Sequence, residues 1–544
     1  MRNVMNSRLT LWGVPIAVGI LAFAFRVLAA SGLTNDHYMT LGWAQQVLFG
    51  EWPERDFVEP GMPLSYLLSA AVQYFWPGPY SELLLTAGML AAAAAVTVVV
   101  AKRLSGFWTI GVFAALLELA FFPRFYSFPK ILTPAVAIFL LQSYARVPSR
   151  RHLMWLGAWT AVSALFRHDL GVYVACAVVV GLVVMHYGQR QALLRALTGV
   201  VAGGSMLFVP YAVYVQWAVG WPEHLRRGFE FSKSDAHQIF SGLPRVADLA
   251  QWNRDGTVAF LFFSTHALLV LALITLVWRR QQHSREERGV AAAVATALAM
   301  FIPVILREPI DGRLADLAGV IALMLAWLLG EGLTAARESR RAGRVATARV
   351  LVVGVVLVAG LIARNVWILT RVDEQIDNTG IYAGARGVNE TWTDLRTAGM
   401  VWPWARAWPT HELPGAVPYL AACTAPTDAV LLTWPAPEYN FFARRRFAAG
   451  HVEFLPPSAF TTDSDQQQMR GWLDRQTVPV ILTNQDRYEE FVRAYPEVAS
   501  YLSSRYRSFA QFTIYDGSTI VLSSRSDLTP TRTWGPEKWP CGFQ

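Results

Sequence analysis

The stretch SGLTNDHYMTLGWAQQVLFGEWPERDFVEPGMPLSY, residues 31–66, lies between two long apolar runs and is itself acidic. It contains one basic residue, Arg55, and five carboxylates: Asp36, Glu51, Glu54, Asp56 and Glu59. Asp36 follows the first apolar run by only a few residues, and an acid at a membrane surface is a functional candidate. The segment 59–63, Glu-Pro-Gly-Met-Pro, leads into the next apolar run. We therefore interpret residues 31–80 as a loop between two membrane helices.

The composition of the whole chain indicates an integral membrane protein. Of its 544 residues, 54% are hydrophobic and only 16% are charged. The apolar residues form blocks long enough to cross a bilayer, which takes about 20 residues. The net charge of +8 would suit nucleic acid. However, the basic residues cluster between the apolar blocks, as the positive-inside rule describes, and we expect no nucleic-acid partner.

Eleven apolar segments predict about eleven transmembrane helices. They cover residues 11–30, 81–101, 107–122, 131–145, 153–166, 171–187, 196–217, 257–278, 290–306, 314–329 and 350–369. All strongly basic linkers share one side if the N-terminus is cytoplasmic, which predicts a multi-pass protein of the cytoplasmic (inner) membrane. The first run exceeds a signal-peptide core of about 7–15 residues, so we expect an uncleaved helix rather than a signal peptide.

Beyond residue 370 the sequence has no further spanning run. Short β-rich runs at 429–433, 478–483, 511–515 and 519–523 alternate with helical stretches at 465–475 and 486–500. Gly517 between the last two runs predicts a hairpin turn. We predict a transmembrane domain over 1–369 and a small extracytoplasmic α/β domain over 370–544. Cys423 and Cys541 either pair there, as an oxidising compartment would permit, or remain thiols.

The order of features in the first loop resembles a known family. An apolar helix, an acid, a short amphipathic helix, a glycine, an acid before proline-rich sequence and another helix resemble the first external loop of GT-C glycosyltransferases. These polytopic enzymes include protein O-mannosyltransferases and bacterial aminoarabinose transferases. In this resemblance Asp36 matches the catalytic acid of the first loop. Phe57-Val58-Glu59 with Pro63-Leu64 is similar to a Phe-x-Glu-Lys-Pro-Pro-Leu segment of the aminoarabinose enzymes.

The match departs from that segment at one position, since Pro60 stands where the lysine would be, and no lysine role is carried over. The resemblance implies inversion at the anomeric carbon. It also implies, in some members, a divalent metal at the acid, for which Asp36 is a candidate ligand. The sequence itself shows no ligand set beyond Asp36 and Glu59, and we assign no other cofactor.

The acids of the loop have two interpretations. Thr34-Asn35-Asp36 precedes a helical stretch, so Asp36 would serve as a helix N-cap, where Asp is favoured. Its place in an outer loop and the family layout favour catalysis, and the two roles can coexist. Glu59 is the second catalytic candidate, because it lies just before the chain re-enters the membrane. Loop carboxylates in general are solvated.

Cations at three outward turns are the candidate phosphate-binding residues: Arg124, Lys130, Arg167 and Arg307, with Asp169 beside Arg167. Outer arginine and lysine run against the positive-inside tendency, so an anion should balance them. Lipid headgroups or neighbouring acids would suffice. The phosphate of a lipid-linked sugar is the sharper hypothesis, because Arg and Lys bind phosphate well.

These features together predict an integral-membrane glycosyltransferase. A polyprenyl-phosphate sugar would be the donor, a lipid, glycan or protein the acceptor, and membrane lipids the surroundings. Asp36 would take the proton of the acceptor hydroxyl, while the cations hold the departing phosphate. The alternative is a transporter or flippase for a lipid-linked glycan, which would more often show charges within its helices and an internal repeat. A third interpretation is a membrane-anchored binding protein whose soluble domain is the active part.

Overall fold

The computed structural model describes residues 8–30, 33, 35–59, 61–237, 243–307, 311–401, 413–454, 459–513 and 517–544. The chain forms two compact units. Unit 1 comprises Met1–Ala30, Leu83–Tyr211 and Ile239–Thr393, and unit 2 comprises Ser31–Glu82, Ala212–Gln238 and Asp394–Gln544. The unit that holds the C-terminal region therefore also holds the first loop. The predicted boundary near residue 370 stays a prediction.

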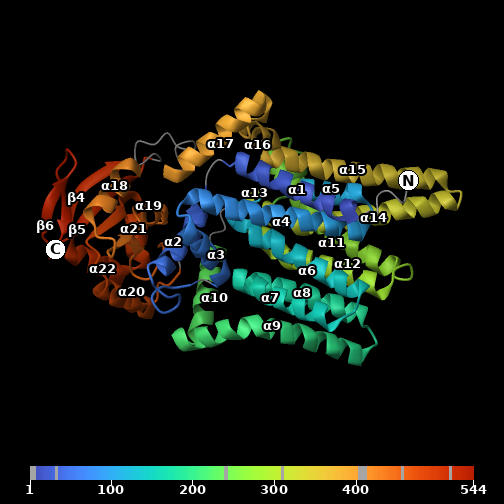
Figure 1. Ribbon diagram of the computed structural model, residues 1–544, viewed down its shortest axis with the longest axis horizontal. Coiled ribbons are helices and arrows are strands. Elements are labelled where there is room, and N and C mark those ends of the chain that lie inside the picture. Colours follow the sequence, from blue (N-terminus) through green and yellow to red (C-terminus); the bar gives the residue numbers. More distant parts are fainter. Residues whose placement is uncertain are drawn as a thin grey trace. The chain divides into compact units, whose positions relative to one another are not determined.

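Unit 1 is a bundle of long helices that run alongside one another (Figure 1). Its elements are α1 (Arg8–Leu28), α4 (Pro79–Ser105), α5 (Trp108–Ala120), η1 (Phe125–Ser127), α6 (Phe128–Arg146), α7 (Arg150–Phe166), α8 (His168–Met185), α9 (Arg190–Ala218), η2 (Val246–Ala250), α11 (Arg254–Trp278), α12 (Arg285–Arg307), α13 (Asp311–Asp316), α14 (Ala318–Arg341), α15 (Val345–Thr370), α16 (Val372–Asn378), η3 (Ile381–Ala383) and α17 (Gly384–Val401). Of these, α4, α9 and α17 extend into unit 2.

Each of the eleven predicted segments overlaps one of these helices. Among the described residues, eight helices are long and apolar enough to cross a membrane: α4, α6 with η1, α8, α9, α11, α12, α14 and α15. The apolar part of α1 and all of α5 form two shorter apolar helices, and α7 has 17 residues. The polytopic helical membrane fold is thus confirmed, with eight spans by this criterion where the sequence predicts about eleven.

Glycine permits the close approach of α7 and α9 within unit 1. A Cβ added at Gly157 would lie 1.8 Å from the carbonyl oxygen of Val200, and one at Gly203 would lie 2.0 Å from that of Met154. No side chain fits at either position. Small residues at such crossings let membrane helices pack backbone against backbone, where lipid supplies no hydrophobic driving force.

Unit 2 combines helices with a mixed sheet. Its helices are α2 (Asn35–Leu48), α3 (Pro63–Phe75), α10 (Trp221–His237), α18 (Leu413–Cys423), α19 (Glu438–Ala443), α20 (Asp463–Arg475), η5 (Gln485–Arg487), α21 (Tyr488–Ala494) and α22 (Pro496–Arg505). Its strands are β1 (Ala429–Leu432), β2 (Arg446–Phe447), β3 (Val480–Asn484), β4 (Tyr506–Thr513), β5 (Thr519–Arg525), β6 (Pro530–Trp534) and β7 (Trp539–Phe543).

The five-stranded sheet has the order β2-β1-β3-β5-β4; Figure 1 labels two of its strands, β4 and β5. The pairs of β1 with β2 and β3 are parallel, and those of β5 with β3 and β4 are antiparallel. The predicted hairpin is confirmed, since β4 pairs with β5 and Gly517 before β5 has a φ of +86°. The predicted helix over 486–500 is two helices, because Pro496 cannot continue α21 and begins α22 instead.

The first loop packs directly on the C-terminal region inside unit 2. The backbone N–H of Val58 donates to the carbonyl of Gly450 at 2.9 Å, and Gln46 donates to the carbonyl of Phe447 at 3.3 Å. Trp43 and Phe57 of the loop share a buried cluster with Phe447. The loop is therefore a structural part of the C-terminal fold rather than a solvated connection.

Candidate functional site

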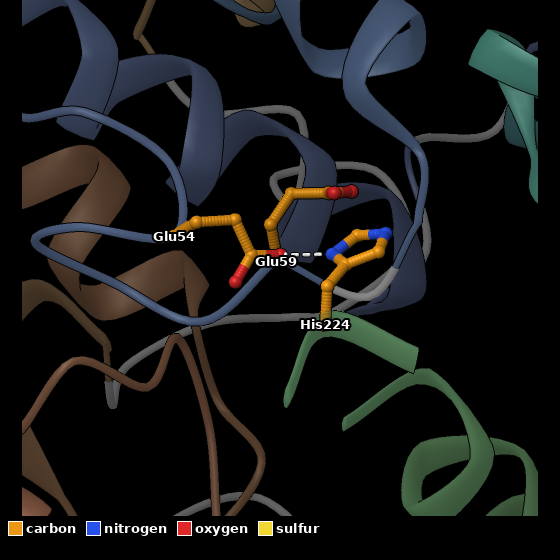
Figure 2. Close-up of side chains that lie close together, drawn as sticks. All are labelled: Glu54, Glu59 and His224. Carbon is orange, nitrogen blue, oxygen red and sulfur yellow. Dashed lines mark hydrogen bonds and ion pairs between the residues drawn. The ribbon is translucent and has the colours of Figure 1, made fainter. Parts of the chain in front are cut away.

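Three side chains of unit 2 that are distant in sequence converge in a buried cluster. Glu54, Glu59 and His224 are 3%, 1% and 2% exposed, and one ligand atom from each lies within 4.8 Å of the others. Figure 2 shows the three side chains pointing toward one another, His224 from α10 and the two acids from the loop. Glu54 Oε1 and His224 Nδ1 are 2.7 Å apart. The group is one that could hold a metal ion.

Arg227 completes the cluster on the Glu54 side. Its guanidinium, 2% exposed, donates to Glu54 Oε2 at 2.9 Å and to Glu223 Oε1 at 2.9 Å, and a third bond of 3.2 Å goes to Gln468. His224 and Arg227 are three residues apart on α10, so both face the loop. Buried charges need partners of this kind to be tolerated.

The backbone of the loop is shaped to present its two acids. Glu54 has a φ of +63°, a left-handed conformation that is uncommon outside glycine and that clusters at functional sites. It lies in a tight turn in which Pro53 and Phe57 form a β-bridge. Glu59 accepts hydrogen bonds from the backbone N–H groups of Gly61 and Met62, which orient its carboxylate.

Burial and charge within the cluster shift the pKa values of Glu59 and His224. Burial, followed by the charge of Glu54, raises the pKa of Glu59 to about 7. For His224, burial lowers the pKa, but the hydrogen bond and charge of Glu54 outweigh it and raise the pKa overall. The carboxyl groups of Glu59 and Glu54 share one small volume, and an added cation would offset the repulsion that contributes to the raised pKa of Glu59.

Asp36 lies in the first turn of α2, is exposed, and stands outside the Glu54–Glu59–His224 group. Its negative charge suits the positive end of the helix dipole. Asp36 also interacts electrostatically with Glu453 of the C-terminal region. A buried hydrogen bond of 2.9 Å from the next residue, His37, to Glu82 at the start of α4 anchors this end of α2.

The predicted phosphate-binding cations gather in unit 1. Lys130, only 6% exposed, pairs with Asp316 at 2.5 Å, and Arg167 and Arg313 lie close enough to influence it electrostatically. Asp169 pairs with Arg167 through two hydrogen bonds. Part of the predicted local compensation by acids is thus present. Burial opposes ionisation of Asp316, but Lys130 chiefly outweighs it and keeps the pKa of Asp316 below its usual value.

Arg124, in the turn after α5, lies against Gly312 of α13, the helix that also carries Asp316. Its guanidinium approaches Gly312 so closely that a Cβ added at Gly312 would lie 3.1 Å from Arg124 Nη2. The turn is held by Arg26 of α1, which donates to the carbonyl of Pro123 at 2.8 Å and lies 3.8 Å over the ring of Phe122. Arg26 is 1% exposed, so it is buried rather than extended to the membrane surface. The side chain of Arg307 lies outside the described part of the chain.

Cys423 and Cys541 form a disulfide, which decides between the two alternatives left open by the sequence. The bridge links α18 to β7 across 118 residues. The third cysteine, Cys176, is free.

The sequence points to Asp36 and Glu59 but not to Glu54, His224 or Arg227 as members of one site. Glu54 is one of five loop acids with nothing to distinguish it, and His224 follows it by 170 residues. Neither periodicity nor a short motif connects them. A cluster of this kind becomes visible only once α10 is packed on the loop.

No protein-family profile and no curated protein matches the sequence. Solved structures do match. ArnT from Cupriavidus metallidurans bound to undecaprenyl phosphate superposes with a TM-score of 0.50 at 12% identity, over 95% of this chain and 98% of that one. The apo state of the same ArnT matches over the same shares with a TM-score of 0.45 at 13% identity. The chain therefore has the GT-C-like fold of ArnT, an aminoarabinose transferase, as the layout of its first loop implied.

Proposed function

We propose that this protein is an integral-membrane glycosyltransferase that moves a sugar from a polyprenyl-phosphate donor to an acceptor at the outer face of the cytoplasmic membrane. The observation that carries the proposal is the GT-C-like fold along 95% of the chain, shared with an ArnT structure that holds undecaprenyl phosphate. The cation group of unit 1 supports the same donor class. The identity of the sugar and the acceptor are not part of the proposal.

The donor phosphate would bind to the cation group. Among the side chains that the structure describes here, Arg124, Lys130, Arg167 and Arg313 carry four positive charges, and Asp169 and Asp316 carry two negative charges. The excess of positive charge suits a phosphate, and guanidinium groups bind phosphate oxygens with two parallel hydrogen bonds. As the sugar leaves, the phosphate gains negative charge, and cations already in place stabilise that charge without reorganisation.

Asp36 would act as the base. It is exposed at the start of α2, so an acceptor hydroxyl can reach it, and His37 and Glu82 anchor the helix end that carries it. A phosphate is a good leaving group and needs no strong general acid. The carboxylate takes the hydroxyl proton, the acceptor oxygen attacks the anomeric carbon, and the bond between that carbon and the phosphate oxygen breaks.

The disulfide supports the outer-face location. Disulfides persist in oxidising compartments and are rare in the cytosol. Cys423 and Cys541 pair in unit 2, which also contains Asp36. An extracytoplasmic unit 2 places the proposed base and the bridge in the same compartment.

The metal implied for some GT-C enzymes would fit the cluster of Glu54, Glu59 and His224. Two carboxylates and one imidazole are a common donor set for Zn²⁺ or Mn²⁺, and all three groups are buried and convergent. The ion would supply positive charge that neutralises the acids and joins the loop to α10. Asp36 is not in this group.

The test of donor binding uses the full chain in nanodiscs and undecaprenyl phosphate as the probe. Charged hydrogen bonds contribute about 1.5–3 kcal/mol each, so Arg124→Gln and Arg167→Gln should each weaken binding roughly 10- to 100-fold. Lys130 is best removed together with its partner, as Lys130→Gln with Asp316→Asn, because a lone buried acid would destabilise the fold. Arg151→Gln, an exposed arginine at the opposite end of α7, is the control.

Transfer is then measured with undecaprenyl-phosphate-linked hexoses and pentoses and a membrane-extract acceptor. The proposal predicts sugar transfer by the parent and its reduction in the cation variants. Binding of undecaprenyl phosphate that is equal in the parent and in all three cation variants would remove the phosphate assignment. A parent that transfers none of the donor sugars would remove the enzymatic proposal.

A further inference from the structure

A narrow cavity, partly open to solvent, lies in unit 2 beside the proposed base. Met39, one turn beyond Asp36 on α2, lines this cavity. Phe231 of α10 and several residues of the C-terminal region line it as well. The residues that matter for its chemistry are Trp43, Phe231, His451, Glu453, Phe460 and Tyr495.

Two polar groups of this lining have no hydrogen-bond partner among the described residues. Trp43 is 3% exposed, and its indole Nε1 is buried without an acceptor. Glu453 Oε2 is likewise buried without a donor. Leaving a buried polar group unsatisfied costs about 1–3 kcal/mol, so such groups call for an explanation. One orphan indole N–H and one orphan carboxyl oxygen on the same small cavity point to a ligand whose groups can both donate and accept hydrogen bonds.

The charge state of the lining favours a neutral ligand. Burial, then the charges of Asp36 and Glu438, raises the pKa of Glu453 well above its usual value, which disfavours the charged carboxylate. Burial, then the charge of Arg227, lowers the pKa of His451 to about 3, so its imidazole is neutral. Both pKa shifts favour the uncharged forms of these two side chains, which suits an uncharged ligand better than an ammonium or a phosphate. Hydroxyl groups, which both donate and accept, match the cavity.

The remaining walls are aromatic. The ring centroids of His451 and Phe460 are 4.9 Å apart, and Phe231 and Tyr495 line the same space. The hydroxyl of Tyr495 donates a hydrogen bond to the carbonyl of Ala459 at 2.8 Å, so Tyr495 contributes mainly its ring to the cavity wall. Apolar faces with a few convergent polar groups are the usual make-up of a small-molecule site. The cavity is too narrow for a whole sugar ring but suits one hydroxylated edge.

We propose that this cavity binds one edge of a sugar ring, with Trp43 Nε1 donating to one hydroxyl oxygen and the carboxyl of Glu453 hydrogen-bonded to a neighbouring hydroxyl. The assignment deepens the proposed function and rests on it for the identity of the ligand as a substrate sugar. Either the donor sugar or a sugar of the acceptor has this chemistry. Trp43 and Glu453 are then substrate-binding residues contributed jointly by the first loop and the C-terminal region.

Binding is tested with the full chain in nanodiscs and a panel of free monosaccharides and their single-deoxy analogues, by saturation-transfer NMR. At least one sugar should give ring-proton signals that fall fivefold or more in both Trp43→Phe and Glu453→Met. Trp43→Phe removes the orphan indole N–H and Glu453→Met removes the orphan Oε2, and losing these two unsatisfied groups should not by itself lower the melting temperature. The controls Trp52→Phe and Glu490→Met alter an exposed tryptophan and an exposed glutamate. They should leave the signals unchanged.

Transfer kinetics separate this inference from the proposed function. A raised KM for the donor alone in both variants places the donor sugar in the cavity, and a raised KM for the acceptor alone places an acceptor sugar there. Normal KM values for both substrates in an active enzyme overturn the cavity assignment and leave the transferase standing. Variant-sensitive sugar binding without any transfer supports the cavity and overturns the transferase. Sugar signals that are equal in the parent and both cavity variants overturn the assignment directly.

Discussion

Replacing Arg227 with methionine should destabilise unit 2 strongly, and the effect should act through Glu54. Arg227 is 2% exposed and is the cation bonded to Glu54 Oε2 at 2.9 Å. Without it, the Glu54 carboxylate, which is 3% exposed, retains His224 as its partner among the described residues and lies beside Glu59. Removing one partner of a buried ion pair costs about 3–5 kcal/mol, because the remaining charge stays uncompensated.

The cost converts into a melting shift that is easily measured. Unit 2 contains about 230 residues, for which 1 kcal/mol corresponds to about 2–4 °C. Arg227→Met should therefore lower the melting temperature by roughly 6–20 °C. The measurement is thermal unfolding of the detergent-solubilised chain followed by tryptophan fluorescence, with one detergent and one scan rate for all variants, since unfolding of such proteins is often irreversible.

A second substitution isolates the cause. Glu54→Gln combined with Arg227→Met removes both charges and should recover a large part of the loss, because no buried charge is then left alone. Arg55→Met is the matched control. Arg55 pairs with the exposed Asp56, with side chains 48% and 31% exposed, and a surface pair of this kind contributes about 0–1 kcal/mol. A double variant that melts below Arg227→Met alone, or an Arg227→Met variant that melts within 2 °C of the parent, would refute the reasoning.

Three further predictions concern catalysis, pH and the disulfide. Asp36→Asn should reduce sugar transfer about 10²- to 10⁴-fold. It should lower the free energy of unfolding by less than about 1 kcal/mol, because the exposed side chain loses only its charge at the helix N-terminus. An Asn variant that transfers sugar at the parent rate would show that Asp36 has only a structural role. In metal-free protein, burial raises the pKa of Glu59 from its ordinary 4.5 to about 7, so between these pH values the folded chain holds a proton that the unfolded chain has lost. The free energy that Glu59 contributes to stability therefore falls as pH rises through this window. Glu59→Gln should flatten this part of the plot of melting temperature against pH, and an unchanged slope would contradict the assignment. Replacing Cys423 and Cys541 with serine should destabilise unit 2 by about 2–5 kcal/mol, since the bridge closes 118 residues of chain. When a reductant opens the bridge, the melting temperature of the parent should fall to that of the double variant. A parent whose melting temperature does not change with reductant would argue against the bridge.

Local sequence patterns determine the broad architecture of this protein. An apolar run of spanning length predicts a helix on its own, because the backbone groups of a segment in lipid must form hydrogen bonds within that segment. Each predicted segment accordingly overlaps a helix, and the apolar runs at 429–433 and 519–523 recur as β1 and β5. The two-residue strand β2 and the hairpin of β6 and β7 were not predicted. β2 is short, and β6 is largely exposed, so neither has an apolar alternation to reveal it.

The burial of α10 shows where pattern reasoning stops. Periodicity would turn Leu225 and Phe229 inward, yet these side chains are 48% and 73% exposed. The structure instead buries His224 and Arg227 of the same helix at 2% each. Hydrophobic periodicity identifies the inner face of a helix only when the core it meets is apolar. Here the partner is the acidic loop, and charge pairing decides the orientation.

A polytopic helical membrane protein with an acidic first loop and a small mixed C-terminal region is predictable from the sequence. These properties depend on hydropathy and charge along contiguous segments, which a linear sequence displays. Three features emerge only from the packed chain: Glu54 and Glu59 meet His224, Lys130 pairs with Asp316, and Trp43 and Glu453 share a cavity. The reason is physical: side-chain electrostatics and hydrogen bonds act over a few ångströms, and the residues involved are separated by tens to hundreds of positions that only packing brings together.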